Sequence, residues 1–287
     1  MEFQSKAQYL DSFVELGLKE DIGEGDHTSL ACIPPSDRCR AKLFVKDAGV
    51  IAGIEVAELV FKKVDPSSTF QAHLKDGEDV TYGQVAFEVE CNTQALLKSE
   101  RLVLNTMQRM SGIATLSNRF AFEVEDLGVR ILDTRKTTPL IRYLEKWAVR
   151  LGGCQNYREG LYDWIMIKDN HIDESGGIRQ AIGKVEAYQK EKGLNLKVTV
   201  EVRNLVELYE VLEVGGINRI LLDNFEMLLL EEAVAIVGKR YETEASGGIT
   251  IHNVRRVAQT GVDFISVGAL THSAVSLDLS LKVIKGL

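Results

Sequence analysis

Residues 129–139 have the sequence Val-Arg-Ile-Leu-Asp-Thr-Arg-Lys-Thr-Thr-Pro, and residues 164–170 have the sequence Trp-Ile-Met-Ile-Lys-Asp-Asn. Each stretch is a short apolar run, rich in β-branched residues and of strand length, that stops at charged side chains. Between them, residues 140–151 are expected to form a helix that ends at Gly152-Gly153. This order of strand, charged loop, helix and strand is the unit of α/β barrels and open α/β sheets, in which functional groups gather where strands end.

The helix after the first strand should have a capped start and an apolar side. Thr137 or Thr138 can accept hydrogen bonds from the first free backbone N–H groups, and Pro139 suits the first turn. The expected apolar side consists of Leu140, Leu144, Trp147, Ala148 and Leu151.

From residue 129 onward the chain alternates strand and helix patterns. Strand-like segments occur at residues 131–134, 165–168, 196–202, 219–223, 242–246 and 263–267. The segments between them are apolar at three- and four-residue spacing, and Asn204, Asn224 and Thr250 are suited to cap helices. Six strands with intervening helices predict an α/β barrel that is incomplete or seven-stranded.

The first part of the chain has a different pattern, which predicts a smaller α+β domain up to about residue 110. Its segments are helical at residues 9–18 and 55–64 and strand-like at residues 40–46, 69–74 and 84–90. A long helix is expected from residue 94 to 110, resuming from 111 to 124. Arg101 lies on a polar side of this helix, for which the plainer interpretation is a solvated surface.

Composition excludes several classes of function. The chain has 287 residues and a net charge of −8, and its pI is near 5.3. An acidic chain is ill suited to nonspecific binding of nucleic acids or anionic membranes, which requires basic surfaces. The first ten residues contain no apolar signal core, and no apolar run reaches the length of a membrane span. The four cysteines form no CxxC pair, which predicts reduced thiols in a cytoplasmic protein.

The ends of the six predicted strands are all polar or contain glycine, as on the active-site face of a barrel. They or the loops beside them supply the cations Arg135, Lys136, Arg158 and Lys168, the carboxylates Glu201 and Asp223, the segment Ser246-Gly247-Gly248, and Gly268 with His272 close behind. Cations suit an anionic substrate, paired carboxylates can hold Mg²⁺ or stabilise a developing positive charge, and glycine-rich turns expose N–H groups to a phosphate. Together they predict an anionic, phosphate-bearing substrate and a divalent metal.

Taken singly, each of these signals has a plainer interpretation. A Ser-Gly-Gly sequence is more often a turn than a phosphate site, and a lysine at a strand end is usually solvated or paired. Glu201 could form an ion pair with Arg203, two residues further along the chain. The functional interpretation therefore depends on the six strand ends taken together.

The residues also resemble a known family, quinolinate phosphoribosyltransferase. The motifs that carry the resemblance are Asp133-Thr-Arg-Lys-Thr-Thr-Pro139, Asn156-x-Arg158-x-Gly160-Leu161, Ile167-Lys-Asp-Asn-His-Ile172, Glu244-Ala-Ser-Gly-Gly248, Glu20-Asp21-x-Gly23-x-Gly25-Asp26 and Glu100-Arg101. The resemblance implies an α/β protein with an N-terminal α+β open sandwich domain, residues 1–112, and an incomplete α/β barrel of about six or seven strands, residues 113–287. The extreme C-terminus is expected to pack back on the N-terminal domain.

The resemblance also implies an activity. The family transfers the phosphoribosyl group of phosphoribosyl pyrophosphate to quinolinate, with Mg²⁺, and releases pyrophosphate and CO₂ to give nicotinate mononucleotide for NAD biosynthesis. It implies a homodimer in which Arg101 of one subunit completes the site of its partner, and it leaves open whether dimers assemble into hexamers. No nucleic acid or membrane partner is implied.

The resemblance assigns roles to individual residues. Lys136, Glu201 and Asp223 are expected to act in catalysis, with Glu201 and Asp223 holding Mg²⁺. The acceptor acid is expected to be bound by Arg101, Arg135, Tyr157, Arg158 and Lys168, and the 5-phosphate by Ser246, Gly247, Gly248, Gly268 and His272. Two residues depart from the family: Tyr157 stands where histidine is usual, and Cys154 stands in place of a third glycine. A phenol donates a hydrogen bond but carries no positive charge near neutrality.

Three alternatives remain open. A paralogue with the same fold could use another acceptor acid, as ModD-type or nicotinate-using transferases do. A barrel aldolase could use Lys168 as a Schiff base, which requires a buried lysine. A non-catalytic ligand-binding or scaffold protein would retain the fold without turnover.

Overall fold

The computed structural model of the protein describes residues 5–284, which divide into two compact units. The sandwich unit contains the residues up to Asn118, Thr138–Gly152 and the residues from Ala274 onward; the barrel unit contains Arg119–Thr137 and Gly153–Ser273. Residues 1–4, at the start of the first expected domain, and residues 285–287, at the end of the second, lie outside the described range. Within that range, none of the helices combines the length and the hydropathy needed to cross a lipid bilayer.

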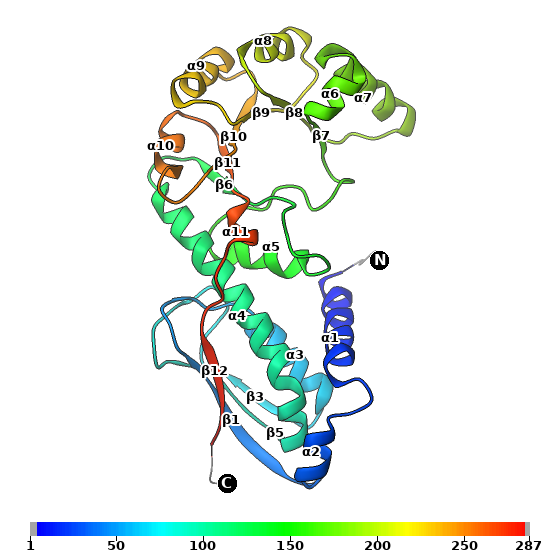
Figure 1. Ribbon diagram of the computed structural model, residues 1–287, viewed down its shortest axis with the longest axis vertical. Helices are drawn as coiled ribbons and strands as arrows, with labels where there is room; N and C mark the ends of the chain where they lie inside the picture. The colour runs from blue at the N-terminus through cyan, green and yellow to red at the C-terminus, as the bar shows by residue number, and fades with distance from the viewer. Residues whose placement is uncertain (1–4, 285–287) are drawn as a thin grey trace. The chain divides into compact units, whose positions relative to one another are not determined.

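The barrel unit is built on a six-stranded parallel sheet (Figure 1). Its strands lie in the order β6 (Arg130–Leu132), β11 (Phe264–Ser266), β10 (Glu242–Ser246), β9 (Arg219–Asp223), β8 (Val198–Val202) and β7 (Ile165–Ile167). All six predicted strands are present, and β6 and β7 form the two edges of the sheet. The prediction of an incomplete α/β barrel is therefore confirmed.

Helices follow the strands along the outer side of the curved sheet (Figure 1). They are α6 (Asp169–Ser175), α7 (Ile178–Lys192), α8 (Leu205–Val214), α9 (Met227–Val237) and α10 (Val254–Gln259), whereas the short helix α11 (Ala269–His272) follows β11 apart from this row. The predicted cap of α8 is confirmed, because the side chain of Asn204 accepts a hydrogen bond from the backbone N–H of Glu207.

The other two predicted caps in the barrel unit are wrong. Helix α9 begins after Glu226, and Asn224 instead adopts a left-handed backbone, with φ 54°, immediately after β9. Helix α10 begins after Asn253, whose side chain accepts a hydrogen bond from the backbone N–H of Thr250. Asn224 and Thr250 thus shape the loops that follow strands rather than the first turns of helices.

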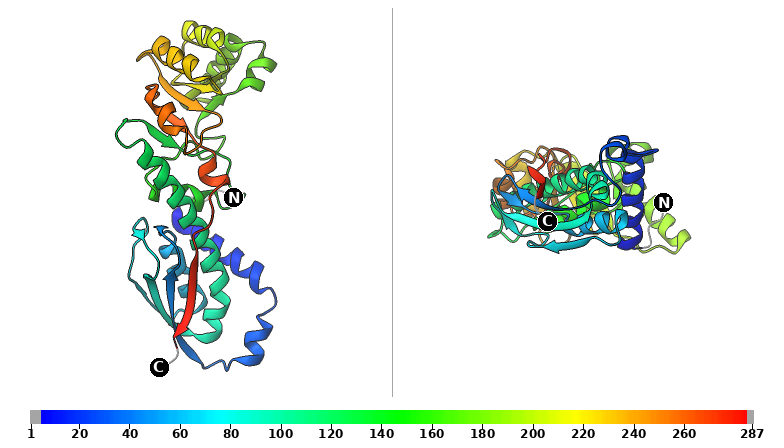
Figure 2. Two further views of the ribbon diagram at one scale, coloured as in Figure 1. Left: turned by 60° about the vertical axis from the view of Figure 1, so that its left-hand side comes forward. Right: turned by 90° about the horizontal axis from the view of Figure 1, so that it is seen from below.

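The sandwich unit contains an antiparallel four-stranded sheet in the order β12 (Leu279–Ile284), β1 (Arg38–Val45), β5 (Val85–Asn92) and β3 (Thr69–Ala72), with a short pair formed by β2 (Gly49–Val50) and β4 (Asp79–Val80). Figure 2 shows β12, in red, beside β1, in blue, and the register runs from Arg40 opposite Ile284 to Val45 opposite Leu279. The C-terminal strand thus completes a sheet whose other strands come from the first hundred residues.

Helices cover one face of this sheet, which is why the unit is an open sandwich (Figures 1 and 2). They are α1 (Lys6–Ile22), α2 (His27–Cys32), α3 (Ile54–Val64) and α4 (Thr93–Glu123). Burial alternates along β1, with Ala41, Leu43 and Val45 fully buried. Helix α4 is one continuous helix of 31 residues, without the pause expected near residue 110.

The start of α5 (Arg142–Leu151) differs from the prediction. Leu140 has φ 68° and is 89% exposed, so it does not join the apolar side of the helix. Thr138 does not cap the helix either; its backbone N–H and its hydroxyl donate to the buried carboxylate of Glu145, at 3.0 and 2.8 Å. The left-handed backbone of Leu140 interrupts the expected first turn, so α5 starts two residues later than predicted.

Candidate active site

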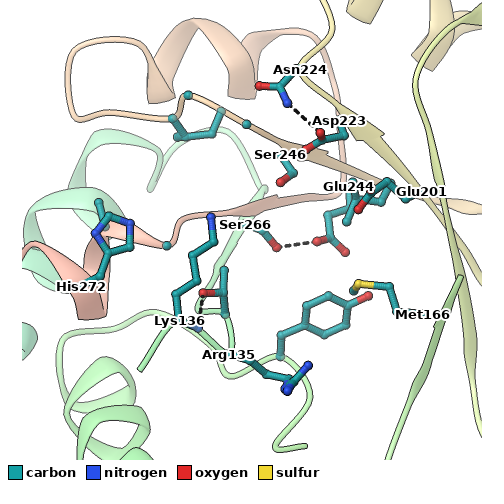
Figure 3. A pocket seen from close by; sticks show the side chains of 18 of the residues that line it. Arg135, Lys136, Met166, Glu201, Asp223, Asn224, Glu244, Ser246, Ser266 and His272 are labelled. Atoms are coloured by element: carbon teal, nitrogen blue, oxygen red, sulfur yellow. Dashed lines mark hydrogen bonds between the residues drawn. The ribbon is translucent and has the colours of Figure 1, made fainter. Parts of the chain in front are cut away.

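The carboxyl ends of the barrel strands surround a cavity of about 930 Å³ (Figure 3). Apart from Arg101, every site residue predicted from the sequence lines it: Arg135, Lys136, Tyr157, Arg158, Lys168, Glu201, Asp223, Ser246, Gly247, Gly248, Gly268 and His272. All of these belong to the barrel unit. Figure 3 shows Lys136 and His272 on one side of the cavity and Glu201 and Met166 on the other.

Two arginines form the cationic part of the cavity. The side chain of Arg158 is largely buried and donates to the carbonyl oxygen of Trp164 at 3.3 Å. Burial, followed by the positive charge of Arg135, lowers the pKa of Arg158. The Nε atom of Arg135 is buried and has no hydrogen-bond partner in the described chain. An unpaired buried donor beside a second cation is costly unless an anion satisfies both, so this part of the cavity fits a carboxylate or phosphate.

Lys168 and Glu201 form an ion pair across the ends of β7 and β8, with Nζ and Oε2 2.6 Å apart. The plainer interpretation that Glu201 pairs with Arg203 is therefore wrong. Strand β8 ends at Val202, so Arg203 leaves the strand and binds Glu207 and Asp173 instead. Glu201 remains directed at the cavity that it lines.

Glu201 and Asp223 stand at the ends of adjacent strands and are the carboxylates suited to a divalent cation. Asp223 accepts a hydrogen bond from the side chain of Asn224 at 2.6 Å, and Glu201 is held by Lys168. In the part of the chain that the structure describes, no group of three or more His, Cys, Asp or Glu side chains is arranged to hold a metal. Two carboxylates still fit Mg²⁺, which commonly takes one or two protein carboxylates and completes its shell with substrate phosphates and water.

The loop after β10 forms the other end of the cavity. Gly247 and Gly248 have φ values of 95° and 61°, which favour glycine, and a Cβ atom on Gly247 would collide with the side chain of Asn224. The loop does not itself open a helix, because α10 begins only at Val254. The loop instead lines the cavity with Ser246 and both glycines. Such consecutive turns can present backbone N–H groups to an anion.

The side chains of Lys136 and His272 both lie close to Gly268. A Cβ atom on Gly268 would lie 3.0 Å from Cδ of Lys136 and 3.2 Å from the ring of His272. The carbonyl oxygen of Lys136 accepts a hydrogen bond from the hydroxyl of Thr271 at 2.8 Å. The segment that follows β6 is thereby tied to α11 within the barrel unit.

Several residues of the cavity were not predicted from the sequence as site residues, above all Glu244. This side chain is fully buried on β10 and forms an ion pair with buried Arg219 of β9 at 3.1 Å. Met166, Leu221 and Asn224 also line the cavity. An inward-facing Glu244 was detectable only as a charge in the middle of an otherwise buried strand, Glu242–Ser246.

Arg101 is the predicted site residue that the cavity does not include. It is exposed on α4 in the sandwich unit. Within a single chain its solvated position agrees with the plainer interpretation, and its expected role depends on a partner subunit.

The fold and the cavity define an α/β-barrel protein whose cavity, at the carboxyl ends of its strands, is suited to an anionic, phosphate-bearing small molecule. Residues 26–111 match the family model described as the N-terminal domain of quinolinate phosphoribosyl transferase, and residues 113–282 match the model of its C-terminal domain. The chain belongs to the quinolinate phosphoribosyltransferase family.

Relatives and solved structures agree with this assignment. The chain is 43% identical to quinolinate phosphoribosyltransferase [decarboxylating] 1b of Nicotiana tabacum, over 96% of this chain and 82% of the relative. It is 40% identical to the probable nicotinate-nucleotide pyrophosphorylase [carboxylating] of Bacillus subtilis, over 92% of this chain and 90% of the relative. The crystal structure of NadC from Streptococcus pyogenes is 35% identical and has a TM-score of 0.91, covering 99% of this chain and 100% of that one.

Proposed function

We propose that the protein transfers the phosphoribosyl group of phosphoribosyl pyrophosphate to quinolinate with decarboxylation, giving nicotinate mononucleotide, pyrophosphate and CO₂ for de novo NAD biosynthesis. The observation that carries the proposal is the unpaired buried Nε of Arg135 beside Arg158, in the cavity that Lys168 also lines. Quinolinate is a dicarboxylate, and these three cations supply enough donors for two carboxylates.

The phosphoribosyl group is proposed to occupy the other end of the cavity. Ser246, Gly247 and Gly248 would hold the 5-phosphate with Gly268 and His272, and Lys136 would bind the pyrophosphate leaving group. This assignment is supported by the closeness of Lys136 and His272 to Gly268 and by the positive φ angles of the loop. It separates the two anionic ends of the reaction along one cavity.

Glu201 and Asp223 would act where positive charge develops. As the ring nitrogen attacks the anomeric carbon and pyrophosphate leaves, the ribose gains positive charge that nearby carboxylates stabilise. The same two residues would hold Mg²⁺, which when bound would offset the negative charge of the pyrophosphate. Ribosylation makes the pyridine nitrogen cationic, so loss of the adjacent carboxylate as CO₂ leaves a stabilised ylide, whose carbon then takes up a proton from solvent to give nicotinate mononucleotide. The protein then has mainly to position the two substrates and to neutralise their charges.

We further propose that the chain is organised along its sequence as residues 1–112 and 113–287, which the meeting of the two family models between residues 111 and 113 supports. Two chains would form a homodimer in which Arg101 completes the site of the partner, a role that its exposed position permits. The four free thiols and the acidic charge suit the cytoplasm.

The alternatives predict different outcomes. An aldolase lysine should be buried, whereas the side chain of Lys168 is 43% exposed and ion-paired with Glu201, so the geometry does not favour a Schiff base. A paralogue for another acid is not favoured by the relatives, whose names specify the decarboxylating or carboxylating reaction.

The test is a parallel assay with quinolinate and with nicotinate, each with phosphoribosyl pyrophosphate and Mg²⁺. We expect nicotinate mononucleotide and CO₂ from quinolinate alone. Product from nicotinate alone would identify the paralogue, and turnover of neither acid at any Mg²⁺ concentration would support a non-catalytic role. Analytical ultracentrifugation, followed by mixing the Arg101→Ala chain with the Lys136→Ala chain, would test the dimer: recovered activity is expected only if one subunit completes the site of another.

A further inference from the structure

Two cysteines stand directly opposite each other on neighbouring strands of the sandwich unit. The register of β1 and β5 pairs Cys39 with Cys91, and Figure 1 shows the two strands side by side. Both residues are free thiols and both are buried, Cys39 with 8% of its surface exposed and Cys91 with none. Burial alternates along β1, so the two side chains belong to the covered face of the sheet.

The backbone ladder fixes how far apart the two strands are at this point. The backbone N–H of Thr93 donates to the carbonyl oxygen of Asp37 at 2.8 Å, and these two residues are opposite each other when the register is continued past Cys39 and Cys91. Bonded pairs recur at every second position of an antiparallel ladder, so Cys39 and Cys91 also form a bonded pair. The Cα atoms of such a pair are about 5.5 Å apart, within the range of about 4.4–6.8 Å that a disulfide requires.

The Cβ atoms need a small movement before a bond between the sulfur atoms can close. Directly opposite Cβ atoms lie about 4.5–5.5 Å apart in antiparallel sheets, whereas a disulfide requires about 3.5–4.5 Å. The pair is placed where such a movement is easiest, because β1 begins at Arg38 and β5 ends at Asn92, each one residue away from its cysteine. The reduced pair is therefore close to the geometry of a disulfide without being held in it.

The two thiols of the pair differ in reactivity. The adjacent thiol of Cys91, which can donate to a thiolate, lowers the pKa of Cys39, and Thr93 and the charge of Arg38 act in the same direction. The thiol of Cys39, together with burial, raises the pKa of Cys91. The thiolate is the nucleophile in thiol oxidation, so Cys39, which is also the more exposed of the two, is the residue that reacts first.

We propose that Cys39 and Cys91 form a redox modification site that closes to a cross-strand disulfide when hydrogen peroxide is present. The thiolate of Cys39 attacks the peroxide and the O–O bond breaks, which leaves a sulfenic acid on Cys39 and, with the proton that Cys39 released, one water. The sulfur of Cys91 then attacks the sulfur of Cys39, the S–O bond breaks, and the hydroxide leaves as a second water with the proton of Cys91. Two thiols and one peroxide thus give one disulfide and two waters, and a dithiol reductant reverses the oxidation.

The disulfide would stabilise the sandwich unit. Between the two cysteines the chain forms β2, α3, β3 and β4, so the bond closes a long loop and restricts the unfolded chain. Oxidised protein should therefore unfold at a higher temperature than reduced protein. The inference does not depend on the proposed function, because the pair belongs to the sandwich unit and the residues that line the cavity belong to the barrel unit.

The test uses the full-length Cys32→Ser chain, which removes the exposed thiol and leaves Cys39, Cys91 and Cys154. The folded protein is treated with hydrogen peroxide and then denatured in the presence of a thiol-alkylating reagent. We expect the count of free thiols to fall from three to one, the mass before alkylation to fall by two hydrogen atoms, and the peptides that contain Cys39 and Cys91 to be linked. Burial raises the pKa of Cys154 to about 12, so this residue should remain a thiol, and dithiothreitol should restore all three.

Two further variants and one condition separate register from mere reactivity. Adding Cys91→Ala should abolish the disulfide and leave Cys39 with added oxygen, whereas adding Cys154→Ala should change nothing. In urea, where the register is lost, the three thiols should pair without preference. The oxidised Cys32→Ser protein should unfold about 5–10 °C above its reduced form. Three thiols that persist in the peroxide-treated folded protein, a link that includes Cys154, or an unchanged unfolding temperature after oxidation would overturn the proposal.

Discussion

The ammonium of Lys168 lies 2.6 Å from the carboxylate of Glu201, at the ends of two neighbouring barrel strands. The side chain of Glu201 is buried and that of Lys168 is 43% exposed, so the pair joins the solvated mouth of the cavity to its interior. A carboxylate placed in this way is oriented before substrate arrives, which is the condition for electrostatic stabilisation of a transition state.

Glu201→Gln should lower kcat by about 10²- to 10³-fold, because the amide keeps the shape of the side chain but not its charge. Steady-state rates of nicotinate mononucleotide formation would measure this. Glu207→Gln is the matched control, since Glu207 pairs with Arg203 just outside the same strand. A kcat within about threefold of the wild type in Glu201→Gln would assign Glu201 a structural role only.

Gly268→Ala should weaken binding of phosphoribosyl pyrophosphate without unfolding the protein. The backbone of Gly268, with φ −65° and ψ −30°, accepts any residue, but the added methyl group would press on Lys136 and His272. Both side chains can give way, and a small misplacement is expected to raise the KM for phosphoribosyl pyrophosphate about three- to tenfold. Kinetics and circular dichroism on the same sample would check both statements; a collapse of folding would contradict the second.

Gly183→Ala should stabilise the protein by about 0.5–1 kcal/mol. Gly183 lies inside α7, where a methyl group would meet no atom within 4 Å, so only the helix propensity changes. Urea unfolding of the variant and the wild type would measure the difference. A loss of stability would mean that the open space beside α7 is filled in solution.

The free energy of unfolding should fall in alkaline solution, partly because the buried phenol of Tyr9 resists ionisation in the folded protein. Burial first, and then the charge of Glu145, raises the pKa of Tyr9 to about 12. A raised pKa in the folded state favours folding fully below the unfolded value of about 10, and this contribution is lost as pH rises toward 12. Two pKa units correspond to about 2–3 kcal/mol.

The variant that checks this is Tyr9→Phe. Its free energy of unfolding should decline less steeply than that of the wild type between pH 10 and 12, although loss of the hydrogen bond to Leu140 lowers its stability at all pH values. Tyr82→Phe, at a position that is 72% exposed, is the control. Equal slopes for Tyr9→Phe and the wild type would refute the burial effect.

The elements that local pattern specifies were predictable from the sequence. The strand β9 was predicted with its observed bounds, because an apolar run bounded by Asn218 and Asn224 is visible without any partner. The polar ends of the strands were predictable for the same reason, and parallel pairing then brings them to one edge of the sheet.

Features that depend on distant partners were not predictable. Thr138 is a candidate helix cap in the sequence, but in the structure its hydroxyl donates to the carboxylate of Glu145 instead. The only local signal of Glu244 is a charge within a buried strand, and its partners Arg219 and Ser266 come from the strands on either side of it. From the sequence, Tyr157 was expected to bind the acceptor acid without the positive charge that a histidine could carry, whereas the structure shows its hydroxyl bonded to Thr199.

The pairing of β12 with β1 has a consequence for synthesis on the ribosome. β12 follows the whole barrel unit in the chain, so β1 leaves the exit tunnel more than two hundred residues before its neighbour. During that time β1 has one unpaired edge, and exposed edges invite pairing with other chains. We therefore expect a chain that stops after Ser273 to aggregate more readily than the full-length chain, although all six barrel strands have been made.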